Sequence, residues 1–291
     1  MPSRDRPRRS ALYMPGSNAR ALEKAKTLPA DVLILDLEDA VAPDAKDAAR
    51  RQVVEAVQGG GYGPREVVIR TNGLATAWGH ADLGAVARSG ADAVLLPKVE
   101  SADMVRQALA VLDAAGAPGD LAFWCMMETP RAMLQAAEIA GAGPRLGALV
   151  MGTSDLAKEL HAAHTPLRLP MLTALGLCLL AARAEGLAIL DGVHLALQDE
   201  EGFAAACAQG RELGFDGKTL IHPKQIEAAN RAFAPSPETL AQARKIIEAH
   251  DAAAREGKGV VVVDGRLIEN LHVVEARRTV DLARQIEALA G

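Results

Sequence analysis

Short aliphatic segments alternate with helix-like segments along most of this chain, and that alternation limits the folds open to it. The aliphatic segments recur roughly every 25 to 40 residues, which is the length of a βα unit. We expect strands at residues 11–14, 31–37, 66–71, 93–97, 122–128, 148–153, 187–191 and 217–221. Segments with helical spacing lie between them, such as 44–57, 102–112, 130–139 and 199–213. Eight such repeats predict an α/β protein with a (β/α)8 barrel rather than an open doubly wound sheet.

The apolar residues are of a kind that suits such a barrel. They make up 49% of the 291 residues, yet aromatic residues account for only 3%. The core must therefore be built from Ala, Val, Leu, Ile and Met. Strands that are covered on both faces by helices read as continuous aliphatic runs, without alternation of polar and apolar residues. The composition therefore agrees with parallel strands enclosed by helices.

The chain divides into three parts. Residues 1–10 are basic and lead into no long apolar segment, so we expect a flexible N-terminal tail. Residues 11–233 hold the eight repeats of the catalytic barrel. Residues 234–291 have a different pattern, with long helices at about 238–256 and 269–289 that flank a strand-like segment at 260–263 and the tight turn Asp264-Gly265. This C-terminal appendage is expected to contact another subunit.

Charge and cysteine content exclude several classes of protein. The net charge of −5 argues against a nucleic-acid binder and offers no attraction to a membrane. The most apolar helical segment, 172–182, is too short to span a bilayer. The three cysteines, Cys125, Cys178 and Cys207, lie in apolar or helical surroundings and have no CxxC spacing. This sparse, odd number indicates reduced thiols and a cytoplasmic protein.

Two carboxylates, Glu128 and Asp155, close the aliphatic segments that begin at residues 122 and 148. In a parallel α/β fold the carboxyl ends of the strands meet at one rim, where ligands bind. Two hard oxygen donors suit Mg²⁺, which usually takes one or two protein carboxylates and leaves its other positions to water and substrate. We therefore predict that Glu128 and Asp155 hold Mg²⁺.

Other strand ends also carry charged or hydrogen-bonding side chains. Arg70 can bind both oxygens of a substrate carboxylate, but it can equally pair with an acid of the Asp36-Leu-Glu38-Asp39 segment, or do both. Those three acids are expected to hold Arg70 or metal-bound waters, and Lys98 is expected to support the site in the same way. Arg20 and Lys24 lie four residues apart on one helix face, where they could grip phosphates. Such basic pairs are common on helix surfaces, so the spacing leaves this question open.

Several segments resemble the citrate lyase beta-subunit and malyl-CoA lyase superfamily. They are Arg9-Ser-Ala-Leu-Tyr-Met-Pro-Gly16, Leu35-Asp-Leu-Glu-Asp-Ala-Val41, Ile69-Arg-Thr-Asn-Gly73, Leu96-Pro-Lys-Val-Glu100, Met127-Glu-Thr129 and Gly214-Phe-Asp-Gly-Lys-Thr-Leu-Ile-His-Pro223. They occur in the family's order from about residue 9 onward. The segments 150–160, 176–183 and 263–272 resemble most the branch whose members hydrolyse (3S)-malyl-CoA.

The resemblance implies a Mg²⁺-dependent barrel that acts on acyl-CoA and assembles as a homotrimer or a dimer of trimers. It implies that Glu128 and Asp155 ligate the metal and that Arg70 binds the carboxylate of the small acid. Tyr13, Arg20 and Lys24 would hold coenzyme A or the acyl group. Ile221 and His222 match a further segment that touches the substrate.

One position departs from the lyases of this superfamily. They carry an aspartate in the C-terminal appendage that reaches into a neighbouring subunit's site, and here the matching residue is Glu269. The extra methylene moves the carboxylate by more than about an ångström, which is enough to change the atom on which the carboxylate acts. We therefore expect hydrolysis of (3S)-malyl-CoA to malate and CoA, with Glu269 as general base or nucleophile.

Two alternatives remain. One is carbon–carbon cleavage of malyl-CoA or citramalyl-CoA to acetyl-CoA and a 2-oxo acid, at the same site. The other is a subunit of a citrate-lyase-type complex that acts on an acyl group bound to a carrier protein.

Overall fold

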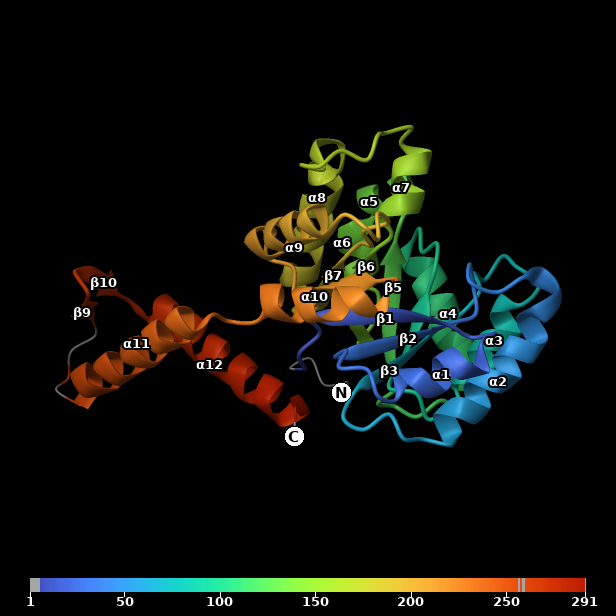
Figure 1. The fold of residues 1–291 in the computed structure, drawn as a ribbon, viewed down its shortest axis with the longest axis horizontal. Helices are drawn as coiled ribbons and strands as arrows, with labels where there is room; N and C mark the ends of the chain where they lie inside the picture. The colour runs from blue at the N-terminus through green and yellow to red at the C-terminus, as the bar shows by residue number, and fades with distance from the viewer. Residues whose placement is uncertain (1–5, 256, 258–259, 291) are drawn as a thin grey trace. The chain divides into compact units, whose positions relative to one another are not determined.

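Eight parallel strands close into a barrel, with the first strand paired to the eighth (Figure 1). The computed structural model describes residues 6–255, 257 and 260–290. The barrel strands are β1 (Ser10–Pro15), β2 (Val32–Asp36), β3 (Glu66–Arg70), β4 (Ala93–Leu96), β5 (Ala122–Met127), β6 (Leu146–Met151), β7 (Ala188–Asp191) and β8 (Gly217–Leu220). Each expected strand is present within one or two residues of its predicted bounds. The predicted (β/α)8 barrel is therefore confirmed.

Helices follow the strands and surround the barrel (Figure 1). The α-helices are α1 (Ala19–Ala25), α2 (Lys46–Gln58), α3 (Gly79–Val86), α4 (Ala102–Ala114), α5 (Pro130–Leu134), α6 (Ala136–Ala140), α7 (Thr153–Glu159), α8 (Leu172–Ala184), α9 (Glu200–Leu213) and α10 (Ile226–Phe233). Short 3-10 turns are η1 (Pro43–Ala45), η2 (Leu169–Met171) and η3 (Pro223–Gln225). The single helix predicted at residues 130–139 is wrong, because the chain leaves helical geometry at Gln135 and forms α5 and α6.

Side-chain alternation along the strands separates two apolar cores. One set of strand residues, which includes Val32, Val68 and Trp124, fills the inside of the barrel. The alternate set, which includes Leu33 and Phe123, packs against the surrounding helices. Both sets are aliphatic because strands inside a helical layer are buried on both faces. As a result the side chains at the strands' carboxyl ends stand on a rigid, close-packed base.

The sixth strand ends earlier than its sequence suggests. We predicted a strand at 148–153 that carries Asp155 at its end, but β6 stops at Met151 and α7 begins at Thr153. Asp155 therefore lies in the first turn of α7 and not on the strand. Asp155 still lies at the rim, because α7 begins directly after the carboxyl end of β6. An acidic side chain in a first turn is also favoured by the helix dipole.

The last residues of the expected N-terminal tail are attached to the barrel. Arg8 forms a bidentate pair with Glu66, with nitrogen–oxygen distances of 2.6 and 2.8 Å. Its guanidinium also lies 5.3 Å from the centroid of a Trp124 ring. Arg9 forms a similar pair with Asp31. The barrel therefore includes residues 8–10, whereas residues 1–5 of the predicted tail lie outside the described residues.

A second compact unit contains residues 234–291, and residues 8–233 belong to the first. In the second unit, α11 (Pro237–Arg255) packs against α12 (Asn270–Ala290) (Figure 1). Their contact contains Ala243, Ala276 and Val280. Between them β9 (Val261–Val263) and β10 (Arg266–Ile268) form an antiparallel hairpin, whose turn has positive φ at Asp264 and Gly265. This is the predicted strand and tight turn. Among the described residues, no helix has the length and apolar character needed to cross a membrane.

Candidate active site at the carboxyl ends of the strands

Arg70 is the centre of a buried ion-pair cluster at the end of β3. Its Nε and Nη2 donate to the two oxygens of Asp36, each at 2.7 Å. Its Nη1 lies 2.8 Å from Glu38 Oε2 and 3.5 Å from Asp39 Oδ2. The guanidinium carbon lies 4.7 Å from the centroid of the Tyr13 ring. These contacts hold the guanidinium in one orientation at the barrel mouth, as planar fork-to-fork pairing does.

The two carboxylates predicted to bind metal are joined by Lys98. The Lys98 Nζ lies 2.7 Å from Asp155 Oδ1 and 3.6 Å from Glu128 Oε1. The backbone N–H of Lys98 also donates to Glu128 Oε1 at 2.8 Å. Glu128 is 1% exposed, whereas the side chains of Lys98 and Asp155 are 40% and 33% exposed. A buried acid and a half-buried acid therefore share one ammonium at the rim.

Burial perturbs the carboxyl groups of this site. It raises the pKa of Glu128 to about 7, although the Lys98 charge and the Lys98 N–H oppose this rise. It raises the pKa of Glu38 to about 8, because the cost of burying the charge exceeds the effect of Arg70. Burial also raises the pKa of Tyr13, and the charge of Glu128 adds to the rise at both Glu38 and Tyr13. The Arg70 cluster and the acid pair therefore form one electrostatic unit.

Glu128 has a carboxylate oxygen that fits a metal ligand. Its Oε2 atom is buried and has no hydrogen-bond partner within the described part of the chain. Leaving a buried carboxylate oxygen unpaired is costly, and a cation would remove that cost. No group of three or more His, Cys, Asp or Glu side chains among the described residues is arranged to hold a metal. A cation here would have two protein carboxylates, which is the number that Mg²⁺ commonly takes.

The other predicted residues lie near the strand ends but outside this cluster. Arg20 and Lys24 are exposed on α1, which follows β1. Ile221 is 38% exposed after β8, and the His222 Nδ1 accepts from the Lys224 N–H to cap η3. Within residues 6–255 the structure records no hydrogen bond or ion pair between these four side chains and the Arg70 cluster.

Glu269 belongs to the second compact unit. It is exposed between β10 and α12. Its backbone N–H donates to the His272 Nδ1 at 3.0 Å, which closes the first turn of α12. The side chain of Glu269 is therefore exposed just before α12 and does not pack in the core.

Two residues of the site were missed from the sequence. Met126 places its Sδ 3.8 Å from Arg70 Nη1 and 3.9 Å from the Tyr13 hydroxyl oxygen. Strand alternation could have found it, because Met126 lies two residues before Glu128 on the same face of β5. Gly152 was also missed. A Cβ there would stand 2.4 Å from the Glu128 Cβ and 2.6 Å from Oε2, and no sequence pattern encodes that approach.

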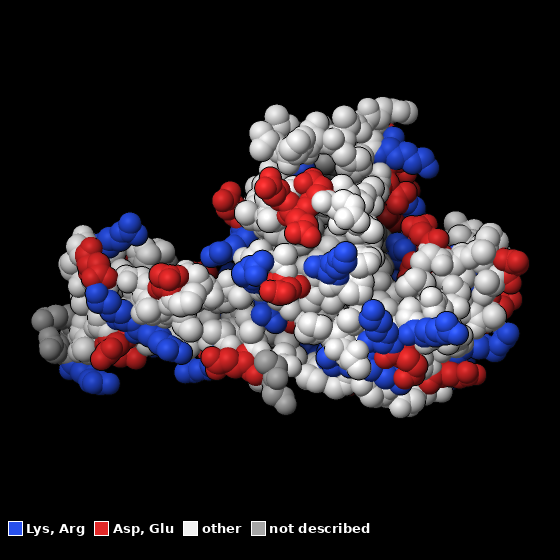
Figure 2. Space-filling model, viewed as in Figure 1, with Lys and Arg blue, Asp and Glu red and all other residues white. Residues whose placement is uncertain are grey.

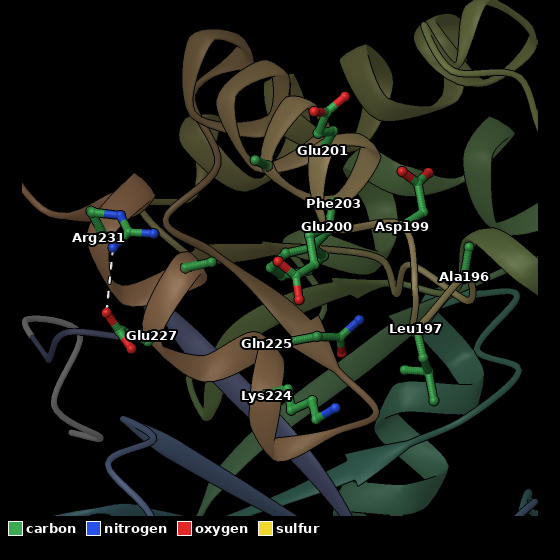
Figure 3. A pocket seen from close by; sticks show the side chains of 12 residues that line it. Ala196, Leu197, Asp199, Glu200, Glu201, Phe203, Lys224, Gln225, Glu227 and Arg231 are labelled. Atoms are coloured by element: carbon green, nitrogen blue, oxygen red, sulfur yellow. Dashed lines mark hydrogen bonds and ion pairs between the residues drawn. The ribbon is translucent and has the colours of Figure 1, made fainter.

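A cavity of about 360 Å³ lies elsewhere, between α9, α10 and the turn after β8 (Figure 3). Its rim carries four acidic side chains, together with Lys224 and Arg231 (Figure 3). None of the residues of the acid pair or of the Arg70 cluster lines it. On the face visible in Figure 2, acidic and basic side chains are interspersed. This cavity is therefore separate from the Arg70 cluster and the acid pair.

The sequence and fold match known proteins over almost the whole chain. The family model described as HpcH/HpaI aldolase/citrate lyase matches residues 9–223. A (3S)-malyl-CoA thioesterase of Cereibacter sphaeroides is 54% identical over 282 residues, covering 97% of this chain and 96% of the relative. A citrate lyase subunit beta of Escherichia coli is 39% identical over 277 residues, covering 94% and 92%. The family resemblance found in the sequence is thereby confirmed.

Solved structures agree with these matches. The protein CitE from Mycobacterium tuberculosis, in complex with magnesium, acetoacetate and coenzyme A, superposes with a TM-score of 0.77 and 31% identity. The match covers 97% of this chain and 100% of that one. A citrate lyase beta subunit from the same organism, complexed with oxaloacetate and magnesium, gives a TM-score of 0.67 at 32% identity, covering 80% and 99%.

Proposed function

The chain belongs to the HpcH/HpaI aldolase/citrate lyase family, and we propose that within it the enzyme hydrolyses (3S)-malyl-CoA to malate and CoA. The observation that carries this assignment is the 54% identity to a (3S)-malyl-CoA thioesterase over 97% of the chain. The site geometry supports it. A buried acid with an unpaired oxygen and a fixed guanidinium lie together at the barrel mouth, which suits a small acid with hydroxyl and carboxylate groups.

Glu128 and Asp155 would hold the metal, for which Mg²⁺ is the proposal. The unpaired Oε2 of Glu128 supports this role, and so does the magnesium present in the related CitE complexes. When bound, Mg²⁺ supplies Lewis-acid polarisation of substrate oxygens.

Arg70 would bind the malyl carboxylate. Asp36 occupies Nε and one Nη2 hydrogen and so fixes the plane of the guanidinium. The Nη1 group faces Glu38 and Asp39, of which Asp39 is 70% exposed. A substrate carboxylate would meet the charge of Arg70 next to the Tyr13 ring. Burial raises the pKa of Glu38, so this acid takes up a proton more easily than an exposed glutamate and then repels an anion less.

Arg20 and Lys24, with Ile221 and His222, would contact the coenzyme A portion. All four follow the carboxyl end of β1 or β8, and these two strands are neighbours in the barrel. The exposed basic side chains of α1 suit phosphate groups. A His222 whose Nδ1 is held by the Lys224 N–H has a fixed ring orientation.

Glu269 would complete the site from a neighbouring subunit of a homotrimer or a dimer of trimers. Its carboxylate would take a proton from water, the water oxygen would attack the thioester carbonyl carbon, and the carbon–sulfur bond would break. The departing CoA thiolate would then receive a proton to give free thiol. Three free, buried cysteines suit the cytoplasm as the compartment of this enzyme.

The test is a product assay with purified protein, (3S)-malyl-CoA and Mg²⁺, in which free thiol and glyoxylate are followed together. We expect thiol and malate without glyoxylate, and no activity from Glu128→Gln. Formation of glyoxylate and acetyl-CoA without thiol would refute hydrolysis and favour carbon–carbon cleavage. A chain that does not act on free CoA esters and requires other subunits would favour the carrier-protein alternative.

Glu269→Asp should shift the products from thiol towards glyoxylate if the length of the side chain at this position determines which of the two reactions occurs.

A further inference from the structure

Lys98 contacts the acid pair through both its backbone and its side chain. The N–H and the Nζ of this one residue lie 2.8 and 3.6 Å from the same oxygen, Glu128 Oε1. The Nζ also lies 2.7 Å from Asp155. A cation bound by Glu128 Oε1 and Asp155 Oδ1 would therefore occupy the position of this ammonium.

The backbone of Lys98 is strained to make these contacts. Its φ is 54°, in the left-handed region that L-residues other than Asn and Asp rarely adopt. Such a conformation is unfavourable for a lysine, and it persists where surrounding contacts impose it. Here the contact is the hydrogen bond from the Lys98 N–H to Glu128. The strain therefore lies directly beside the acid pair.

The ammonium satisfies the acid pair incompletely. Glu128 Oε2 remains buried without a hydrogen-bond partner among the described residues. The Lys98 side chain is 40% exposed and Asp155 is 33% exposed, so their ion pair competes with water and is weak. A long, flexible side chain that is half in water can swing away at little cost. The arrangement is therefore one that a more highly charged cation can replace.

We propose that Lys98 is a built-in competitor of the divalent cation, which pairs with Glu128 and Asp155 until the metal displaces its ammonium, and so lowers the metal affinity of the site. This proposal rests on the metal-binding role proposed above for the two acids. Its physical basis is repulsion, since a +2 ion and an ammonium cannot share two carboxylates a few ångströms apart without a large Coulomb cost. Removing the Lys98 charge should therefore strengthen metal binding.

The test measures Mn²⁺ binding to the full-length, native oligomer without substrate, after treatment with EDTA and dialysis. Free Mn²⁺ is followed by electron paramagnetic resonance in wild type, Lys98→Met, Lys98→Gly and Lys98→Arg. Lys98→Gly provides a second charge-free variant that suits a positive φ and therefore folds without the strain. Lys158→Met, which removes an exposed lysine from the same helix as Asp155, is the matched control.

We expect both charge-free variants to bind Mn²⁺ about tenfold more tightly or better, which corresponds to about 1.4 kcal/mol. Lys98→Arg and Lys158→Met should stay near wild type. The rise in Tm on adding Mn²⁺ should be larger for Lys98→Met than for wild type.

The proposed competition is overturned if wild type binds Mn²⁺ and both charge-free variants bind it equally tightly or more weakly. Lys98 would then support the site or the fold without opposing the metal. If wild type and Glu128→Gln bind Mn²⁺ equally, or neither binds it, the metal role of the acid pair fails, and the competition fails with it. The two failures are therefore distinguishable.

Discussion

At the scale of single residues, the site depends on close approach as much as on charge. Glu128 lies beside Gly152, where the backbone after β6 comes so near that any side chain would collide with the carboxylate. Because Glu128 is almost fully buried, it has no free direction in which to retreat. The glycine thus helps to decide where the carboxylate oxygens lie.

Gly152→Ala should therefore weaken metal binding without removing any ligand. The new Cβ would overlap Glu128 and displace it, for which we expect about a 10- to 100-fold loss of Mn²⁺ affinity, the usual effect of disturbing a ligand's support. Paramagnetic resonance titration measures this directly. Gly176→Ala in α8 is the control, because nothing lies within 4 Å of a Cβ there. Unchanged affinity in Gly152→Ala would mean that Glu128 is not a ligand in this position.

At the scale of elements, a buried ion-pair network fastens the segment after α7 to the barrel. Arg168 Nη1 donates to both oxygens of Asp191, at 2.7 and 2.8 Å, and Lys218 Nζ donates to the same carboxylate at 2.8 Å. Asp191 ends β7 and Lys218 lies on β8, where they are 0% and 1% exposed. The φ of Arg168 is 52°, so the backbone is strained in the conformation in which Arg168 contacts Asp191.

Asp191→Asn should destabilise the protein by about 3–5 kcal/mol, because it leaves the buried ammonium of Lys218 and the partly buried guanidinium of Arg168 without their counter-ion. Burial alone would raise the pKa of Asp191, but the charges of Lys218 and Arg168 outweigh it and lower that pKa. The ionised carboxylate therefore stabilises the fold above its unfolded pKa of about 4, and this contribution is lost as the pH falls.

Urea unfolding at fixed protein concentration should thus show a difference in free energy of unfolding between wild type and Asp191→Asn that narrows as the pH falls below about 4. Asp103→Asn is the control, since its pair with Arg106 is exposed and should change stability by less than about 1 kcal/mol. A difference that stays constant with pH would mean that the charge of Asp191 is not what the network uses.

At the scale of the whole molecule, the proposed reaction needs residues from both compact units. Glu128, Asp155 and Arg70 belong to the barrel, and Glu269 belongs to the unit of residues 234–291. If Glu269 serves a neighbouring subunit, two inactive variants can restore each other within one oligomer. If it serves its own barrel, they cannot.

Glu128→Gln and Glu269→Gln should each be inactive alone, and mixed oligomers made by co-expression should regain about one quarter of wild-type thiol release. The regain arises at sites that combine an intact barrel with an intact Glu269 from the adjacent chain. Mixing the two purified variants without subunit exchange is the control. Mixed oligomers that stay inactive would show that the site is not shared between chains.

Much of this architecture follows from sequence, because periodicity is a local property. The aliphatic runs placed all eight strands, and the Asp264-Gly265 pair placed the hairpin turn. The break at Gln135 was missed, because Ala-rich segments on both sides keep helical spacing. The boundary between β6 and α7 was also missed, because Val150-Met-Gly-Thr-Ser-Asp155 reads as a continuation of the strand.

By itself the sequence determined the barrel, the family and which residue types stand at the strand ends, because these depend on pattern and on the identity of single residues. Only the tertiary structure decided that Asp36 takes the fork of Arg70 and that Gly152 leaves room for Glu128. It alone placed the Lys98 ammonium between the two acids. Such contacts join residues from different strands, and their distances depend on barrel closure and strand register, which no local pattern encodes.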